Sequence, residues 1–324
     1  HDHDAFGGQV AFPNSKIVGG FDFGDNDSNP TLDCDQQRHA SSVTSILAGN
    51  GGGLTGTAPD AEVVFLKLSR ASDCGILGFA GDLTAALNWV VTNRATFGID
   101  VLSLSLGFGS FDNTATCNGF SAGVRNALQA AYDAGITTFA AAGNDGLCNG
   151  IAHPACLPTV ISVGGVYDDA IGERNFCVST LSCSGADDPD LGCFACNDAN
   201  PQADQPSCLL NTGSLLDLFA PTRCAKSIRA STTNTTDTRN CFGGTSAAAP
   251  FAAGIAATLL EAAPTLTPSD LRTLLTSTGD GIFDSRNGRT IPRVNGDAAL
   301  SAALDIFSDG FESGNTSSWT SSVF

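Results

Sequence analysis

The sequence predicts an α/β protein in which a parallel β-sheet carries helices on both faces. One observation is a series of short runs rich in Val, Ile, Leu and Ala, the composition of strands that are buried on both faces. These runs are Lys16–Phe23, Glu62–Leu68, Asp100–Leu106, Thr137–Ala142, Val160–Val166 and Asp217–Phe219. The other observation is that helical patterns lie between the runs. Strands and helices that alternate in this way form a parallel sheet with helices on both sides.

Three of these helical patterns are the clearest, and their ends support the prediction. Asp82 precedes the helix expected over Leu83–Ala95, and Gly135 follows the helix expected over Ala122–Ala134. A third helix is expected over Pro268–Thr276. An acidic residue or Pro favours the start of a helix, and Gly favours its end.

The composition fits one globular domain from an oxidising compartment. The 324 residues are 42% hydrophobic and 15% charged, which is enough apolar surface to bury one large core. The net charge is −18, whereas nucleic acids and anionic membranes are bound through clusters of Lys and Arg. We therefore expect neither of these partners, and we expect a monomer. The 12 Cys show no repeated metal-type pairs and indicate disulfides, as in secreted, extracellular proteins.

The segment Gly243–Pro250 places one Ser between a glycine turn and a long apolar run, Ala247 to Ala263. A hydroxyl at the start of a helix lies beside unpaired N–H groups and the positive end of the helix dipole. This position suits a nucleophile whose target gains negative charge. The other interpretation is that Ser246 only caps a buried helix. The apolar run is short, Ala-rich and broken by Pro250, so a core helix explains it better than a membrane span.

Several motifs resemble those of the subtilisin-like serine proteases. The segment around Ser246 is similar to the Gly-Thr-Ser-x-Ala-x-Pro signature of the nucleophile in that family. His39–Gly49 resembles the family's His-Gly-Thr-His-Val-Ala-Gly helix, with Ala40, Ser42 and Ser45 in place of a Gly, the second His and another Gly. Four further segments match those of the family, namely Thr55–Glu62, Ala140–Gly146, Pro158–Gly164 and Leu216–Pro221. The resemblance extends from about Ala5 to about Leu304.

The resemblance implies a subtilisin-like three-layer sandwich over residues 1–305, followed by a short polar tail over residues 306–324. It also implies a secreted serine endopeptidase that hydrolyses peptide bonds of protein or peptide substrates through an acyl-enzyme. Ser246 would be the nucleophile, His39 the general base and Asn144 the donor to the oxyanion. Asn144 also has a structural interpretation, because Gly143-Asn144-Asp145-Gly146 is strong turn chemistry.

The acidic member of the catalytic triad has no match before His39. In the family this Asp ends a hydrophobic strand, and His3–Gly8 resembles a stretch that follows it by several residues. We therefore expect the Asp just before residue 1, so that residues 1–324 alone would cleave poorly. Asp2, Asp4 and Asp22 are not assigned to the triad. An alternative stays open, a catalytically degenerate subtilisin-like domain with a protein-binding or structural role.

Two segments resemble the main-chain walls of the family's substrate site. Ser105, Leu106 and Gly107 form one of them, and Ala141, Ala142 and Gly143 form the other. In the family such segments hold the substrate as an added strand and wall the first specificity pocket. Hydrogen bonds to the main chain do not distinguish the side chains of a substrate, so we expect the protein to accept many different protein substrates. Leu106 and the two Ala suggest an apolar pocket.

A structural Ca²⁺ ion is the one cofactor that the resemblance implies. Pro158, Val160 and Asp217 match positions where two carbonyl oxygens and one carboxylate bind calcium in proteinase K-like members. Oxygen ligands of this kind suit Ca²⁺. The other interpretation is that Asp217 is a carboxylate at a strand end with a purely structural hydrogen bond.

The spacing of the cysteines suggests three disulfides. Cys148 and Cys156 bracket a short loop, Cys224 and Cys241 bracket the loop before the Ser246 turn, and Cys34 and Cys74 flank the His39 motif and the strand after it. The six other Cys allow 15 connectivities, which the sequence does not resolve. Cys177 to Cys208 reads as an insertion between two matched segments, with five Cys and little hydrophobic pattern.

Overall fold

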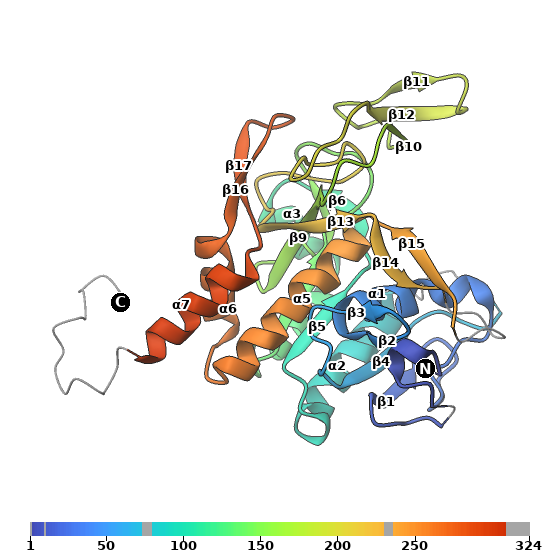
Figure 1. Ribbon diagram of the computed structural model, residues 1–324, viewed down its shortest axis with the longest axis vertical. Helices are drawn as coiled ribbons and strands as arrows, with labels where there is room; N and C mark the ends of the chain where they lie inside the picture. Colours follow the sequence, from blue (N-terminus) through green and yellow to red (C-terminus); the bar gives the residue numbers. More distant parts are fainter. Residues whose placement is uncertain (1, 10, 73–79, 230–235, 309–324) are drawn as a thin grey trace, which may run out of the picture.

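The computed structural model describes residues 2–9, 11–72, 80–229 and 236–308. Its centre is a six-stranded sheet, and a smaller three-stranded sheet lies at one end of the molecule (Figure 1). The central sheet has the order β16-β17-β13-β9-β7-β5. Its strands are β5 (Val101–Leu104), β7 (Thr137–Ala141), β9 (Val160–Tyr167), β13 (Leu218–Arg223), β16 (Asp280–Asp284) and β17 (Arg289–Arg293). Neighbouring strands from β5 to β17 run parallel, and β16 is antiparallel to β17.

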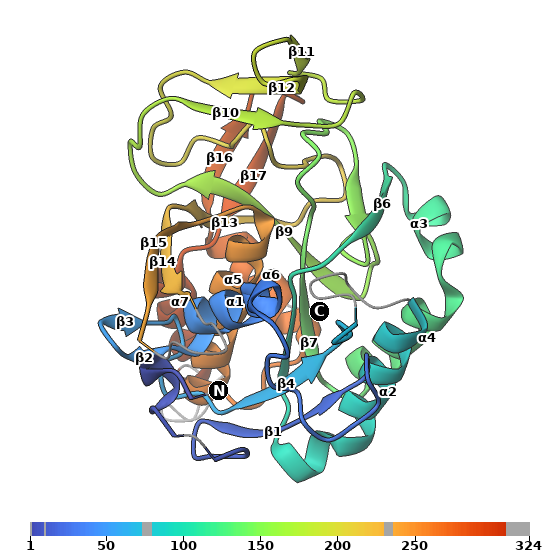
Figure 2. The same cartoon turned by 90° about the vertical axis from the view of Figure 1, so that its right-hand side faces the viewer.

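Helices cover both faces of this sheet, which confirms the predicted fold class (Figure 2). The described helices are α1 (His39–Ala48), α2 (Ala80–Phe97), α3 (Thr114–Phe120), α4 (Ala122–Asp133), α5 (Thr245–Ala262), α6 (Pro268–Thr278) and α7 (Gly296–Ser308), with 3₁₀ turns η1 (Asp4–Phe6) and η2 (Asp35–Arg38). On one face Phe139 and Ala141 pack with α5, α6 and α7; on the other, Ala140 and Ala142 pack with α2 and α4. Side chains alternate along a strand, so one run of apolar residues serves both layers.

Helix α5 fills the core with small side chains. Its alanines at positions 247, 248, 249, 252, 253 and 256 are fully buried. By length and composition α5 could cross a membrane. Here it packs against β5, β7, β9 and β13 instead, as the sequence predicted for a core helix.

Strands β1 (Ile17–Asp22) and β4 (Val63–Lys67) form a separate parallel pair. Among the described strands, β4 pairs with β1 alone and β5 with β7 alone. The sequence predicted that both β4 and β5 would be buried on both faces. Instead, every residue of β4 and the first three of β5 are half-buried, whereas β7 and β9 are buried throughout. The reason is that residues of both strands line one cavity.

The remaining strands form small sheets at the periphery. Two-stranded pairs are β2 (Asn50–Gly51) with β3 (Leu54–Thr55), β6 (Phe108–Phe111) with β8 (Ile151–His153), and β14 (Ala225–Ile228) with β15 (Thr238–Phe242). The cysteine-rich insertion forms the three-stranded sheet of β10 (Arg174–Cys177), β12 (Cys193–Asp198) and β11 (Ala186–Asp188). It lies at the top of both views, far from β1 (Figures 1 and 2).

The disulfides confirm one sequence prediction and correct another. Cys224 is bonded to Cys241, as expected. The predicted Cys148–Cys156 bridge is wrong, because Cys148 is bonded to Cys183 and Cys156 to Cys117. The insertion contains the further bridges Cys177–Cys193 and Cys196–Cys208. Cys34 is disulfide-bonded, but Cys74 lies outside the described residues, so that proposed pair stays a prediction.

Candidate active site

Ser246 lies in the first turn of α5, directly after a turn that only glycine fits well. Gly244 has φ +85°, and a Cβ there would lie 3.1 Å from Asn144 Oδ1. The left-handed backbone and the close approach therefore both favour glycine. The first N–H groups of a helix have no partner within it. The backbone N–H of Ser246 is one of these, so it is available to a ligand beside its own hydroxyl.

Pro250 and Ser105 together fix the carbonyl group of Ser246. Pro250 lies inside α5 and has no N–H to donate to the carbonyl four residues earlier. The hydroxyl of Ser105 donates to that Ser246 oxygen instead, at 2.9 Å. Ser105 was predicted to bind substrate, and its side chain is engaged with the helix that carries the nucleophile.

Asn144 follows β7, and its side chain is oriented by Thr245. Asn144 Oδ1 accepts hydrogen bonds from the Thr245 backbone N–H at 2.9 Å and from Thr245 Oγ1 at 3.1 Å. Two donors at this atom identify it as the oxygen of the amide. The Asn144 NH₂ group has no partner among the described residues and can donate to a ligand. Thr245 Oγ1 also accepts from the Gly143 N–H at 3.1 Å, so one Thr holds the end of β7 against the start of α5.

Asn211 is a residue at this site that the sequence analysis missed. It is fully buried, and its Oδ1 accepts from the N–H groups of Asp145 and Leu147 at 2.9 and 3.1 Å. Its Nδ2 donates to the Ala142 carbonyl at 3.2 Å and to Asp145 Oδ2 at 3.0 Å. The turn that carries Asn144 is thus held on both sides by one amide. The one signal in the sequence is the position of this Asn between two apolar runs.

His39 is the first residue of α1. Val43 of α1 and Ala247 of α5 belong to one buried cluster, which brings the starts of the two helices together. The His39 ring meets the edge of Phe242, with ring centroids 5.6 Å apart. The surrounding chain displaces part of the water around the His39 side chain, which lowers the pKa of His39. The positive charge of Arg239 lowers it further. Both effects favour the neutral imidazole, the form that accepts a proton.

One cavity of about 1340 Å³ collects the predicted residues. His39, Asn144 and Ser246 line it together with Leu106 and Gly107. Ser105, Ala141 and Gly143 line it as well. Leu104 of β5 pairs with Ala140 of β7, so the residues that follow these two lie side by side at the ends of the strands. Ala142 is not among the lining residues; its carbonyl accepts from the Ala152 N–H at 2.8 Å. The residues chosen from separate motifs therefore meet in one place, as expected at the carboxyl ends of parallel strands.

No carboxylate forms a hydrogen bond or ion pair with His39 within the described part of the chain. Asp22 is 1% exposed and pairs with Lys67 at 2.5 Å. Lys67 also pairs with Asp33 and lies 3.6 Å from Asp25. These three carboxylates are therefore occupied by the ammonium group at the end of β4. Asp22 is thus paired with Lys67 and not with His39.

The expected calcium ligands do converge, but around an arginine. The Arg272 guanidinium donates to the carbonyl oxygens of Pro158 and Val160 at 2.8 and 2.7 Å and to Asp217 Oδ1 at 2.7 Å. Asp217 Oδ2 accepts from the N–H and hydroxyl groups of Ser162. A guanidinium and a Ca²⁺ ion cannot share these oxygens. The arrangement therefore does not fit the ion.

The sequence matches the subtilase family, peptidase S8, over residues 10–301. The chain belongs to the subtilase family. Among the relatives of this subtilase, subtilisin DY from Bacillus licheniformis is 29% identical over 275 residues, which cover 83% of this chain and 79% of that protein. Thermitase from Thermoactinomyces vulgaris is 29% identical over 280 residues, which cover 86% and 80% of the two chains. Family membership places the chain among the serine-type peptidases.

Solved structures agree with this assignment. A cold-adapted subtilisin-like serine proteinase superposes with a TM-score of 0.63 at 26% identity and covers 91% of this subtilase and 84% of its own chain. A prenylagaramide maturation protease, PagA, gives 0.60 at 21% identity and covers 93% and 88%. At that identity the second match supports the fold alone.

Proposed function

We propose that this protein is a secreted serine endopeptidase that hydrolyses peptide bonds of protein substrates through an acyl-enzyme. Ser246 is the nucleophile, His39 is the general base, and Asn144 donates to the oxyanion. The observation that carries the proposal is the pairing of Asn144 Oδ1 with Thr245 at the start of α5. It leaves the Asn144 NH₂ group without a partner among the described residues. Five disulfides between described cysteines support the secreted location.

The chemistry assigns one role to each group. The Ser246 hydroxyl attacks the carbonyl carbon of the substrate while neutral His39 takes its proton. The negative charge that develops on the carbonyl oxygen is stabilised by the Asn144 NH₂ group and by the Ser246 N–H. The protonated His39 then gives its proton to the leaving amine as the peptide bond breaks. A water molecule that gives a proton to His39 then attacks the acyl-enzyme. The acid product leaves, and His39 returns the proton to the Ser246 oxygen.

A covalent probe tests these roles. A fluorophosphonate should label Ser246 of the full-length protein, and Ser246→Ala should abolish the labelling. Ser269→Ala is the matched control, because Ser269 is an exposed serine on α6, remote in sequence from the site. Labelling that persists in Ser246→Ala would show that another residue is the nucleophile.

We further propose that a carboxylate reaches His39 on an additional β-strand between β4 and β5. The cavity extends between these strands, where Val64 and Leu66 of β4 and Val101 and Ser103 of β5 line it. Each strand has a free edge on this side among the described elements, and apolar residues that remain half-buried. Free edges of this kind accept a further strand.

The segment that precedes residue 1 is the occupant we propose. The first described turn, η1, is buried against β4: Phe6 packs against Phe65 with ring centroids 6.1 Å apart, in a cluster with Val63. Chain that leads into η1 therefore enters the molecule beside β4. This agrees with the expected hydrophobic strand that ends in the triad Asp.

The test compares residues 1–324 with the same chain extended upstream. Loss of the triad Asp costs about 10⁴ in turnover in related serine proteases, so the extension should raise casein cleavage by a comparable factor. It should also slow amide hydrogen exchange at Leu66 and Ser103, whose N–H groups point away from the existing partners β1 and β7. If residues 1–324 cleave as fast as the extended protein, a carboxylate within this chain serves His39, and Asp2, Asp4 and Asp22 are the positions to mutate.

The alternative, a domain that binds protein without cleaving it, is not proposed. Binding does not require an amide held by two donors beside a serine at a helix start. Nor does it require a neutral histidine lining the same cavity.

A further inference from the structure

Asn211 contacts the chain on both sides of Asn144 without lining the cavity that contains Ser246. Its side chain is fully buried, and it is not among the described residues that line the cavity. A Cβ on Gly143 would lie 2.3 Å from Asn211 Nδ2, so the turn approaches this amide as closely as a glycine allows. Any effect of Asn211 on the reaction must therefore pass through another residue.

The backbone at Asn211 is hydrogen-bonded to the same turn as its side chain. The Asn211 N–H donates to the Gly143 carbonyl at 3.0 Å, and the Thr212 N–H donates to the Leu147 carbonyl at 2.8 Å. Together with the bonds of the Asn211 side chain, these contacts bracket Asn144 along the chain. The position of the Asn144 backbone therefore depends on that of Asn211.

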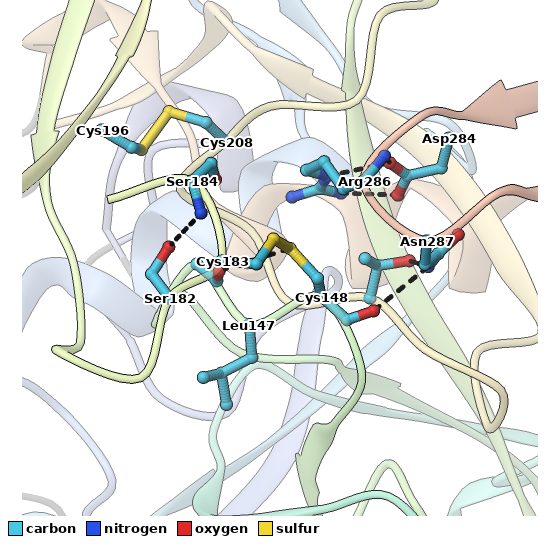
Figure 3. The surroundings of a disulfide bond; sticks show 12 residues. Leu147, Cys148, Ser182, Cys183, Ser184, Cys196, Cys208, Asp284, Arg286 and Asn287 are labelled. Atoms are coloured by element: carbon cyan, nitrogen blue, oxygen red, sulfur yellow. Dashed lines mark hydrogen bonds and ion pairs between the residues drawn. A yellow bond between two sulfur atoms is a disulfide. The ribbon is translucent and has the colours of Figure 1, made fainter. Parts of the chain in front are cut away.

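Arg286 holds the segment that carries Asn211, which belongs to neither a helix nor a strand. Its guanidinium donates to the carbonyl oxygens of Ser207 and Leu210 at 2.9 and 2.7 Å. Figure 3 shows the guanidinium paired in turn with Asp284, which is buried. Hydrogen bonds from a charged donor are stronger than neutral ones. The segment thus has a fixed position although it lies in a loop.

Asn287, in the same turn between β16 and β17, joins this segment to the turn that follows Asn144. Its Nδ2 donates to Thr212 Oγ1 at 3.0 Å and to the Cys148 carbonyl at 3.3 Å (Figure 3). Thr212 follows Asn211, and Cys148 follows the last residue that the Asn211 side chain binds. The two segments are therefore held together at a second place.

We propose that Asn211 is a positioning residue for peptide hydrolysis, which fixes the backbone from which the Asn144 amide reaches the oxyanion; this rests on the proposed function. Thr245 sets the direction of Asn144 Oδ1. Asn211 fixes the main chain of the same turn through the N–H groups of Asp145 and Leu147. An oxyanion donor must be in place before the charge develops, and a displacement of about 1 Å can cost about 10²-fold in rate.

Two substitutions of Asn211 test this role. Asn211→Ala removes every side-chain bond and should lower kcat by about 10–100-fold, with KM nearly unchanged. Asn211→Asp keeps the shape of the side chain and the bonds that Oδ1 accepts, and loses the bonds donated to Ala142 and Asp145. Because it leaves no void, it serves if Asn211→Ala does not fold, and it should also lower kcat at unchanged KM.

The Asn144→Ala background separates positioning from a general structural effect. If Asn211 acts through Asn144, adding Asn211→Ala or Asn211→Asp to Asn144→Ala should change kcat by less than about twofold, because the donor that Asn211 positions is already absent. A purely structural role would lower kcat by the same factor in both backgrounds.

Ser207→Ala is the matched control, because Ser207 is also buried in this loop and its hydroxyl bonds to other elements. It contacts Tyr167 Oη of β9 at 3.2 Å and donates to Asp198 Oδ2 of β12 at 3.1 Å. It should lower the melting temperature and leave kcat unchanged.

Folded Asn211 variants that keep the wild-type kcat, or losses that add in the double variants, overturn the inference. A wild type that neither reacts with fluorophosphonate nor cleaves any peptide would instead contradict the proposed function.

Discussion

Arg272 donates a hydrogen bond to Asp217 across 2.7 Å, and the same guanidinium binds the carbonyl oxygens of Pro158 and Val160. A side chain thus provides the positive charge at a place where the sequence led us to expect a calcium ion. The pair is only partly exposed, 28% for Arg272 and 20% for Asp217. Its charge-assisted hydrogen bonds therefore retain part of their strength.

Replacing this arginine should destabilise the protein and make it respond to calcium. In Arg272→Ala, two carbonyl groups and a carboxylate lose their donor, which should cost about 1–3 kcal/mol in the free energy of unfolding. Added Ca²⁺ should recover part of this loss, because three oxygen ligands become free. The melting temperature of the wild type should not change with a chelator.

Arg94→Ala is the control, since Arg94 forms an exposed pair with Asp100 at 3.4 Å and should contribute little. A chelator that lowers the wild-type melting temperature, by an amount that Asp217→Asn removes, would restore the calcium interpretation of these residues.

Asn144→Ala should lower kcat and leave KM nearly unchanged. Its amide is positioned to donate to the negative charge on the carbonyl oxygen, which develops in the transition state and is absent from the bound substrate. The expected loss is about 10²–10³, the value known for removal of such a donor from subtilisin. Steady-state kinetics with a peptide substrate measure it. A change in KM alone would mean that Asn144 binds substrate without stabilising the oxyanion.

The apolar pocket expected beside Leu106 can be tested with complementary changes at Gly107 and Ala152, which both line the cavity. A Cβ on Gly107 would lie 2.7 Å from the Cβ of Ala152, so Gly107→Ala forces the two segments apart. We expect kcat/KM for a peptide with Phe before the cleaved bond to fall by about tenfold or more. Ala152→Gly in the same protein should restore much of it, because the clash is removed. Additive effects in the double variant would show that the two residues do not meet.

Stability should fall as the pH falls from 6.5 to about 4, and His153 should account for part of the loss. Burial between Phe111 and Phe120 lowers the pKa of His153 to about 4. Neither ring nitrogen has a hydrogen-bond partner in the described structure. The unfolded chain binds a proton below pH 6.5, whereas the folded protein does not until about pH 4. Acid therefore favours unfolding over this window and adds no further loss below it.

Urea denaturation at several pH values measures this effect. His153→Leu keeps an apolar side chain among the two Phe rings and removes the titration, so its free energy of unfolding should depend less on pH between 6.5 and 4. Parallel pH curves for the variant and the wild type would assign the acid sensitivity to other groups.

The sequence predicted the central strands and the gathering of His39, Asn144 and Ser246 because both follow from local patterns. Buried parallel strands are continuous apolar runs, and small residues around a functional side chain leave a recognisable motif. Prediction from the sequence failed where the contacts join residues that are distant along the chain. Nothing near Arg272 indicates that its guanidinium binds Pro158, 114 positions earlier in the chain. Likewise, spacing favoured the nearer Cys156 for Cys148, whereas the fold brings Cys183 to it.

Two further differences have a physical cause. Strands β16 and β17 were not predicted, because Asp280–Asp284 and Arg289–Arg293 are mostly polar and only half of this hairpin meets the core. Asn211 was missed because its role lies in hydrogen bonds to backbone groups of another turn, and such groups are the same in every residue.

The insertion leaves the core after β9 and returns before β13, and these two strands are direct neighbours in the central sheet. Its ends are therefore fixed by the sheet, whatever sequence lies between them. Cys148–Cys183 and the Ser179 N–H bond to the Asp145 carbonyl hold the loop between β10 and β11 at two points. The residues between these points can therefore change while Ser246 and Asn144 keep their places. Sequence changes within residues 178–182 would then alter the lining of the cavity, where Ser179 and Leu181 lie, and leave the reaction centre unchanged.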